Sequence, residues 1–103
     1  MSIKLAVLRS GETIISDIKE LVSDNKVCGY LFDKPHIINI KKEIVLIEKT
    51  DETNVNQGEV QVSLSPWIVL TEDEQMPVQL DYVVTLVNPI NSIKQMYEEK
   101  VNA

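Results

Sequence analysis

Residues 59–65 read Glu-Val-Gln-Val-Ser-Leu-Ser, a strict alternation of polar and apolar side chains. Val60, Val62 and Leu64 fall on one face of an extended chain, and the polar residues fall on the other. This period of two is typical of a β-strand with one buried face. The segment therefore predicts a strand in a sheet, and the neighbouring segments are interpreted outward from it.

A second strand is predicted over residues 78–87, and a helix after it. The side chains that share one face of this strand are Val78, Leu80, Tyr82, Val84 and Leu86. Val83 and Val87 add apolar surface to the other face, which indicates burial on both sides or a contact between subunits. Asn88 is a suitable N-cap and Pro89 a suitable first helical residue. Apolar residues at helical spacing then predict a short amphipathic helix over about residues 89–101, namely Ile90, Ile93, Tyr97 and Val101.

The beginning of the chain predicts a hairpin. Alternation over residues 3–8 predicts a strand, and Ser10-Gly11 predicts a tight turn after it. Residues 12–22 fit either a helix or a strand by their apolar spacing. The short Ser-Gly link favours a strand, because two strands joined by such a link form a hairpin.

The next segment predicts further strands and turns. Residues 23–26 are polar and predict a turn, and residues 27–32 form a short apolar run. We expect a boundary or a sheet edge at Pro35, because proline cannot donate to a sheet ladder. Beyond it, residues 36–40 and 43–47 predict either two strands or one bent strand.

Two polar segments of the second half predict loops. Residues 49–58 predict a mobile loop, and residues 71–77 predict an acidic loop around Glu72-Asp73-Glu74. Three adjacent acids lack the spaced oxygen ligands of a calcium loop, so a solvated loop is favoured over a metal site. We predict that Trp67 is structural, because the apolar run at residues 68–70 indicates an apolar environment.

Composition indicates one β-rich domain spanning residues 1–103, with a net charge of −6. Residues 1–49 carry eight basic and seven acidic side chains (+1), whereas residues 50–103 carry two basic and nine acidic ones (−7). Such acidity opposes nucleic-acid binding at long range, so any RNA contacts should lie in the first half. The sequence contains neither a membrane-span-length apolar stretch nor the apolar core of a signal peptide, which predicts a cytoplasmic location.

The residues give no support to catalytic or cofactor chemistry. Cys28 is the only cysteine and His36 the only histidine, so a catalytic thiol–imidazole pair would have to join these two. A buried small thiol and a loop histidine are the favoured interpretation. The three glycines are isolated, which excludes a glycine-rich phosphate loop. We therefore predict a protein that is not an enzyme and that binds no cofactor or metal.

The order of glycine, aromatic and asparagine residues resembles that of the Sm/LSM-like family. Gly11 corresponds to the glycine of the first turn, and Gly29, Phe32-Asp33 and Asn39 to the later landmarks. The family's second motif, a strand, an Arg-Gly turn and a final strand, is similar to residues 82–91, where Arg-Gly is absent. The resemblance implies a mainly β fold, a small and strongly bent five-stranded barrel, here with a C-terminal helix. It also implies a homo-oligomeric ring, hexameric or heptameric, that binds single-stranded and often uridine-rich RNA.

The resemblance also implies a set of RNA-binding residues. They are Asp33, Lys34, His36, Asn39, Lys41, Lys42, Asn88 and Asn91. The lysines would meet phosphates, the other first-half residues would stack on bases or bond to base edges, and the two later asparagines would replace the Arg-Gly turn. Two alternatives stay open. Pro35 and His36 can simply shape a turn while the lysines keep a sheet edge soluble. The chain can also be a non-enzymatic, oligomeric structural or adaptor module that binds protein partners.

Overall fold

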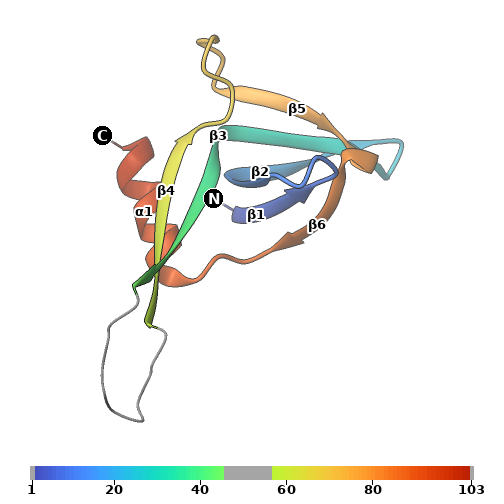
Figure 1. Cartoon of the computed structure of the whole chain (residues 1–103). Helices are drawn as coiled ribbons and strands as arrows, with labels where there is room; N and C mark the ends of the chain where they lie inside the picture. The colour runs from blue at the N-terminus through green and yellow to red at the C-terminus, as the bar shows by residue number, and fades with distance from the viewer. Residues whose placement is uncertain (1, 46–56, 103) are drawn as a thin grey trace, which may run out of the picture.

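The chain forms a curled antiparallel β-sheet with one helix at its C-terminal end (Figure 1). The computed structural model describes residues 2–45 and 57–102, and the side chains of residues 2–41 and 61–102. The elements are β1 (Ile3–Leu8), β2 (Thr13–Ser23), β3 (Lys26–Val45), β4 (Gln57–Pro66), β5 (Gln75–Gln79), the 3-10 turn η1 (Leu80–Tyr82), β6 (Val83–Val87) and α1 (Asn91–Val101). The predicted mainly β fold with a C-terminal helix is confirmed.

The order of strands in the sheet is β4-β3-β2-β1-β6, and β5 pairs with β3. Residues 29–33 of β3 pair with β5, and residues 36–45 pair with β4, so both partners lie on the edge of β3 opposite β2. The prediction of a closed five-stranded barrel is wrong, because the sheet has six strands and its path of pairing ends at β4 and β6. The loop at residues 67–74 separates β4 from β5, which makes the number of strands six and not five.

A bulge in β3 bends the sheet. Between the pairs Ile15–His36 and Asp17–Asp33, β3 has one residue more than β2, and Lys34 has a φ of 51°. This extra residue reverses the faces of β3, as a bulge does. Before it the even-numbered Phe32 faces the inner core, and after it the odd-numbered Ile37 does.

Of the two alternatives expected at Pro35, the strand boundary is wrong, since β3 continues to Val45 as one bent strand. Proline is tolerated because Pro35 sits where β3 changes partner from β5 to β4. The Pro35 carbonyl accepts the N–H of Trp67 at 3.1 Å, and the N–H of Lys34 donates to Glu74 at 2.6 Å. The alternative of one bent strand over residues 36–47 is therefore confirmed up to Val45. The last two residues of this predicted strand, 46 and 47, lie outside the described residues.

The predicted turns of the first half are confirmed. Gly11 has a φ of 91°, a left-handed conformation that favours glycine, and its N–H donates to the Leu8 carbonyl at 2.9 Å. Asp24 and Asn25 also have positive φ, 51° and 63°, as the turn of a tight hairpin requires. These turns join β1 to β2 and β2 to β3, so residues 12–22 form a strand and not a helix.

The second half departs from the prediction at its element boundaries. The strand predicted over residues 78–87 is broken by η1, and the register shift against β1 leaves Val84 exposed. Most of the loop predicted at residues 49–58 lies outside the described residues, but Gln57 and Gly58 begin β4. The acidic loop ends at Glu74, because residues 75–77 belong to β5.

The helix begins later than predicted, at Asn91 with Ile90 as its cap. Asn88 is therefore not the N-cap. Its side-chain oxygen instead accepts a hydrogen bond from Lys4 Nζ. Among the described residues, no helix is long and apolar enough to cross a membrane.

Apolar side chains form one cluster inside the curl of the sheet and one outside it. The inner core contains Ala6, Leu8, Ile14, Ile18, Phe32 and Val78. Trp67 packs against this core, 6.0 Å from Phe32 between ring centroids, so its predicted structural role is confirmed. The apolar environment of Trp67 comes from this core and not from residues 68–70, because all three of those side chains are exposed.

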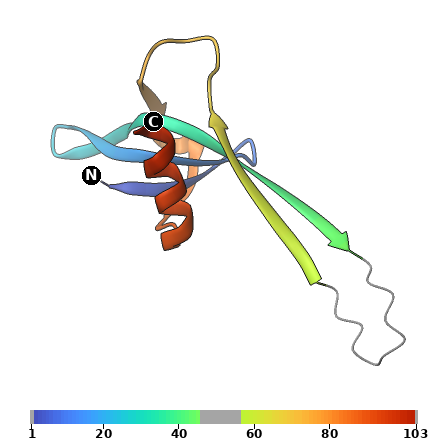
Figure 2. The same ribbon diagram turned by 90° about the vertical axis from the view of Figure 1, so that its left-hand side faces the viewer.

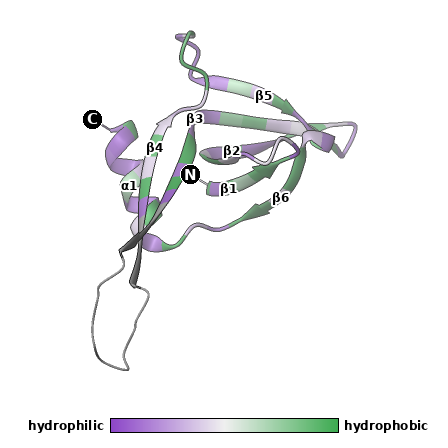
Figure 3. Ribbon diagram, in the orientation of Figure 1, coloured by the Kyte–Doolittle hydropathy of each residue, from purple (hydrophilic) through white to green (hydrophobic). Residues whose placement is uncertain are grey.

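The outer core lies between the sheet and α1, which crosses the sheet (Figure 2). It contains Ile3, Ile15, Leu64 and Tyr97, with Ile93, Met96 and Val101 of the helix packed around them. Figure 3 shows how apolar residues follow the strands, whereas the β2–β3 turn is polar. Strands β1, β2 and β3 therefore contribute apolar residues to both cores, because the sheet is curled and also covered by a helix.

Candidate functional site

The Tyr97 side chain connects α1 to the bulge of β3. Its hydroxyl donates to the carbonyl oxygens of Asp33 at 2.9 Å and Lys34 at 3.0 Å, and accepts the N–H of Asp17 at 3.3 Å. Ser16 Oγ donates to the same Asp33 carbonyl at 2.8 Å. Carbonyls at a bulge fall out of the regular ladder and need such partners when buried. The hydrogen bonds of Asp33 and Lys34 at this junction are thus main-chain and structural.

His36 belongs to the same junction. Its Nδ1 lies 2.9 Å from the Lys34 carbonyl, and its ring meets the ring of Tyr97 edge to face with centroids 5.7 Å apart. The side chain is half-buried in β3, so the expectation of a loop histidine is wrong. A ring held in this way is poorly placed to serve as an open platform for a nucleic-acid base.

Replacing Tyr97 with phenylalanine should lower the free energy of unfolding by about 1–3 kcal/mol, because the Asp33 and Lys34 carbonyls lose the hydrogen bonds that the tyrosine hydroxyl donates. Urea unfolding measures the change. The control is Tyr30→Phe, since the Tyr30 hydroxyl makes no hydrogen bond within the described residues. The control should change the free energy by under about 0.5 kcal/mol. Equal losses in the two variants would contradict the role given to the Tyr97 hydroxyl.

The same junction predicts a dependence on alkaline pH. Burial, and after it the carboxylates of Asp33 and Asp17, raise the pKa of Tyr97 above its ordinary value of 10.0, although the hydrogen bond from the Asp17 N–H opposes the shift. A raised folded-state pKa means that the folded chain holds the proton more tightly than the unfolded chain. This contribution is fully present below pH 10.0 and is lost as pH rises through the folded-state pKa. The Tyr97→Phe variant should lack this contribution, so its free energy of unfolding should fall less between pH 10 and higher pH than that of the unaltered chain.

Beyond the bulge, β3 and β4 pair only with each other and form a two-stranded arm, residues 38–45 and 57–64 (Figure 2). Asn39 is exposed on the arm opposite Ser63, and its Nδ2 donates to Ser65 Oγ at 3.2 Å. Lys41 is exposed opposite Gln61. This face of the arm presents amide, hydroxyl and ammonium groups to solvent.

An open hollow of about 430 Å³ lies along the arm. It is lined by Asn39, Ile40, Lys41, Gln61, Val62 and Ser63. By strand alternation, Asn39, Lys41, Gln61 and Ser63 share one face of the arm, whereas Ile40 and Val62 belong to the other face. We call this open hollow the arm hollow. A second open hollow is lined by Glu72, Asp73, Glu74 and Gln75, but no group of His, Cys, Asp or Glu among the described residues is arranged to hold a metal ion.

The predicted site residues are thus divided among three places. Asp33, Lys34 and His36 form the junction with Tyr97, Asn39 and Lys41 lie on the arm, and Asn88 and Asn91 lie at the two ends of the segment that leads into α1. Asn91 is exposed and begins the helix. The side chain of Lys42 lies outside the described residues. Gln61 and Ser63 were not predicted as site residues, although they belong to the polar face of the strand predicted over residues 59–65. Only the pairing of β3 with β4 brings them beside Asn39 and Lys41.

The lone cysteine differs from expectation. Cys28 is exposed in β3, and its thiol lies 3.2 Å from the Leu21 carbonyl. It precedes the bulge, whereas His36 follows it. The expectation of a buried small thiol is wrong because Cys28 lies on the β2–β3 hairpin beyond the core.

Comparison with known proteins adds no assignment: no protein-family model matches the chain, and no curated protein matches it.

Proposed function

We propose that the chain is an Sm-like subunit that assembles into a ring and binds single-stranded, uridine-rich RNA. The observation that carries the proposal is the arrangement of β4 and β5 on one edge of β3. If β4 and β5 are counted as one strand that the loop at residues 67–74 interrupts, the sheet has five strands and is bent at the bulge. The segment β5-η1-β6 then runs from the edge of β3 to the edge of β1 and curls the sheet around the inner core. This supports the small, strongly bent β-sheet that the sequence resemblance implies, in an open form and not as a closed barrel.

Self-association is supported by the two ends of the sheet. Within the described residues, β4 and β6 each have one edge without a strand partner. Unpaired edges readily accept a strand from another chain. Val84 and Val87 also expose apolar surface on β6. Pairing of β4 in one copy with β6 in the next would repeat around a ring, which we propose to contain six or seven subunits.

RNA binding is supported by the polar groups of the arm hollow. Asn39, Gln61 and Ser63 offer donors and acceptors of the kind that bond to base edges, and Lys41 adds a positive charge. Asn39 and Lys41 belong to the half of the sequence that carries +1, and the residues that pair with them on β4, Ser63 and Gln61, are uncharged. Repetition around a ring would multiply a weak site. Because the rings of His36 and Tyr97 pack together, we assign His36 to holding the root of the arm and not to stacking on a base.

Asn39→Ala should weaken binding of oligo-uridine by about tenfold, the loss expected of a base-edge contact worth roughly 1–3 kcal/mol. Fluorescence anisotropy with labelled oligo-uridine at low salt measures the affinity, and oligo-adenosine tests the preference for uridine. Asn102→Ala is the matched control, since Asn102 is also exposed but lies at the far end of α1. An equal loss in both variants would contradict the assignment of the hollow.

A second candidate function is an adaptor that binds protein partners. Residues 50–103 carry −7, and the loop at residues 67–74 exposes aliphatic side chains beside three acids. If the assembled chain binds neither oligonucleotide at tens of micromolar protein, the fold assignment stands and the function moves to this candidate.

A further inference from the structure

The loop between β4 and β5, residues 67–74, which we call loop 67–74, exposes a run of aliphatic residues. Ile68, Val69 and Leu70 are 46%, 76% and 98% exposed. Among the described residues, no other stretch exposes three large aliphatic side chains in succession. Such a run is unfavourable in water and typically marks a binding surface.

Loop 67–74 is held at its base. The Trp67 N–H donates to the Pro35 carbonyl at 3.1 Å, and the Lys34 N–H donates to the Glu74 carbonyl at 2.6 Å. Both bonds attach the loop to the bulge of β3. The Trp67 ring packs on Phe32 of the inner core. The aliphatic run is thus presented from a fixed base, which lowers the entropy that a partner must remove on binding.

Three acids follow the aliphatic run in the same loop. Glu72, Asp73 and Glu74 are exposed, and they make no ion pair within the described residues. The sequence has no lysine or arginine at residues 50–93, so no neighbour along the chain neutralises them. The Cα atoms of Leu70 and Glu72 are at most about 7.6 Å apart, because consecutive Cα atoms are separated by 3.8 Å. A partner that covers Leu70 therefore comes within reach of these carboxylates.

The acids select the chemistry of that partner. A carboxylate that loses water at an interface needs a cation in exchange, because an unpaired charge is costly to desolvate. RNA is opposed at this loop, since its phosphates would meet three carboxylates, and an anionic membrane surface is opposed for the same reason. The surface that fits is apolar with lysine or arginine beside it, as on a basic amphipathic helix.

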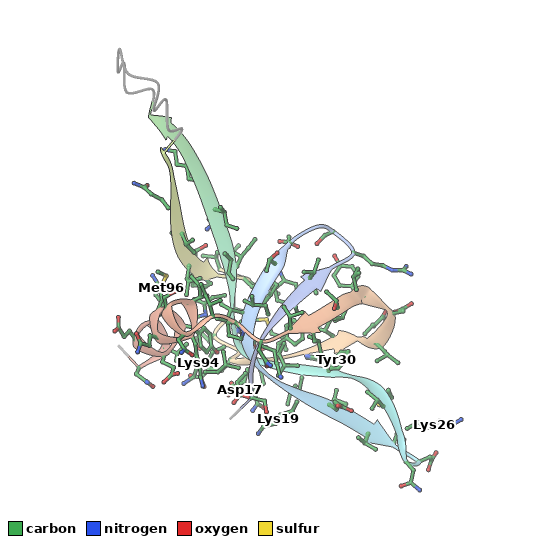
Figure 4. All side chains as sticks on the ribbon, turned by 90° about the horizontal axis from the view of Figure 1, so that it is seen from below. Asp17, Lys19, Lys26, Tyr30, Lys94 and Met96 are labelled. Carbon is green, nitrogen blue, oxygen red and sulfur yellow. The ribbon has the colours of Figure 1, made fainter. Side chains whose placement is uncertain are left out.

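The β2–β3 hairpin shows that an exposed aliphatic residue alone does not provide this combination. Val22, 62% exposed, lies on the hairpin between Lys19 and Lys26 (Figure 4). Residues 19–26 contain two lysines and two acids, so they carry no net charge. Loop 67–74 joins a run of aliphatic side chains to a net charge of −3.

We propose that loop 67–74 binds a basic amphipathic segment of a partner protein. The apolar side chains of that segment cover residues 68–70, and its lysine or arginine side chains meet the acids at residues 72–74. The loop and the arm project from the body in opposite directions (Figures 1 and 2). Partner binding at the loop therefore leaves the arm hollow open, and it does not depend on the proposed RNA binding.

Binding of three labelled peptides tests the proposal, with fluorescence anisotropy as the measurement. The probe is a short amphipathic peptide of leucine and lysine. A leucine–glutamate peptide reverses its charge, and a serine–lysine peptide removes its apolar face. The leucine–lysine peptide should bind at least about tenfold more tightly than either of the others, because only this peptide matches both parts of the loop.

A first pair of variants tests the aliphatic run. Leu70→Ser should weaken binding of the leucine–lysine peptide by at least about tenfold, because Leu70 is the most exposed residue of the run. Val22→Ser is the matched control, since Val22 is also exposed but lies on the hairpin, and it should leave the affinity unchanged.

A second pair of variants tests the acids. Glu72→Gln combined with Glu74→Gln should weaken binding of the leucine–lysine peptide and make it less sensitive to salt. Glu20→Gln combined with Asp24→Asn is the control on the hairpin. Both double variants change the net charge from −6 to −4, so a difference between them reports position and not total charge. The control should keep the affinity and the salt dependence of the unaltered chain.

The outcomes separate this partner site from the proposed function. Equal losses in a variant and its control, or equally tight binding of the serine–lysine peptide, would overturn the proposal. It would also be overturned if Leu70→Ser dissociated a self-associated chain or released the chain from neutral phosphatidylcholine vesicles, because the loop would then serve a second copy or a lipid surface. A chain that binds oligo-uridine but not the peptide keeps the RNA function without this partner. A chain that binds the peptide through Leu70 but binds no RNA supports the partner site and moves the function to the adaptor.

Discussion

Ending the chain after Pro89 should remove most of its stability. The deletion removes α1 and strips the cover from the outer core, including Tyr97, which is 2% exposed and bonded to the bulge. Deleting one buried aromatic side chain costs about 3–5 kcal/mol, and whole domains are stable by only about 5–15 kcal/mol. We expect the melting temperature to fall by at least roughly 15 °C, or cooperative unfolding to disappear. Circular dichroism during heating measures either result.

A shorter deletion is the control for this experiment. Removing only residues 102 and 103 leaves every helical contact of the outer core in place, so the melting temperature should stay within about 2 °C of the full chain. An unchanged melting temperature after the longer deletion would mean that α1 does not stabilise the sheet, which would contradict the packing of Tyr97 described above.

Phe32→Ala should lower the free energy of unfolding by about 3–5 kcal/mol. Phe32 has no exposed surface, lies at the centre of the inner core, and supports Trp67 at the base of loop 67–74. The cavity would therefore destabilise the sheet and loosen the anchor of the loop together. Urea unfolding gives the free energy, and a red shift of Trp67 fluorescence in the folded state reports the second effect.

Val22→Ala is the matched control, because Val22 is an exposed aliphatic residue on β2, the strand that pairs with Phe32 through Ile18. Its effect should stay below about 0.5 kcal/mol. A loss of under about 1 kcal/mol for Phe32→Ala would show that the inner core does not close around this ring.

The sequence predicts local elements of this fold well where a pattern and a turn agree. The alternation at residues 59–65 correctly predicted β4. The turn at Gly11 correctly predicted a hairpin, and β2 is therefore a strand and not a helix. The break at residues 80–82 was not predictable, because the apolar alternation continues through η1 without a glycine or proline. Similarly, Pro35 indicated either a strand boundary or a sheet edge, whereas pairing with β5 and then with β4 continues β3 past it.

The candidate site was predicted in part for the same reason. The family resemblance drew attention to Asp33 and His36. Their partner at the bulge is Tyr97, more than sixty residues away, and no local sequence pattern predicts this contact. Asn39 and Lys41 were predicted, whereas Gln61 and Ser63 depend on the register between β3 and β4. Long-range pairing decides which polar residues share a surface, and alternation within one strand decides only which face each occupies.

Native mass spectrometry of the full chain mixed with oligo-uridine at low salt tests the central claim most directly. We predict a closed assembly of six or seven chains that carries bound RNA and releases the RNA as salt is raised. A chain that remains a monomer of 11.7 kDa without RNA under these conditions would contradict both the ring and the RNA site.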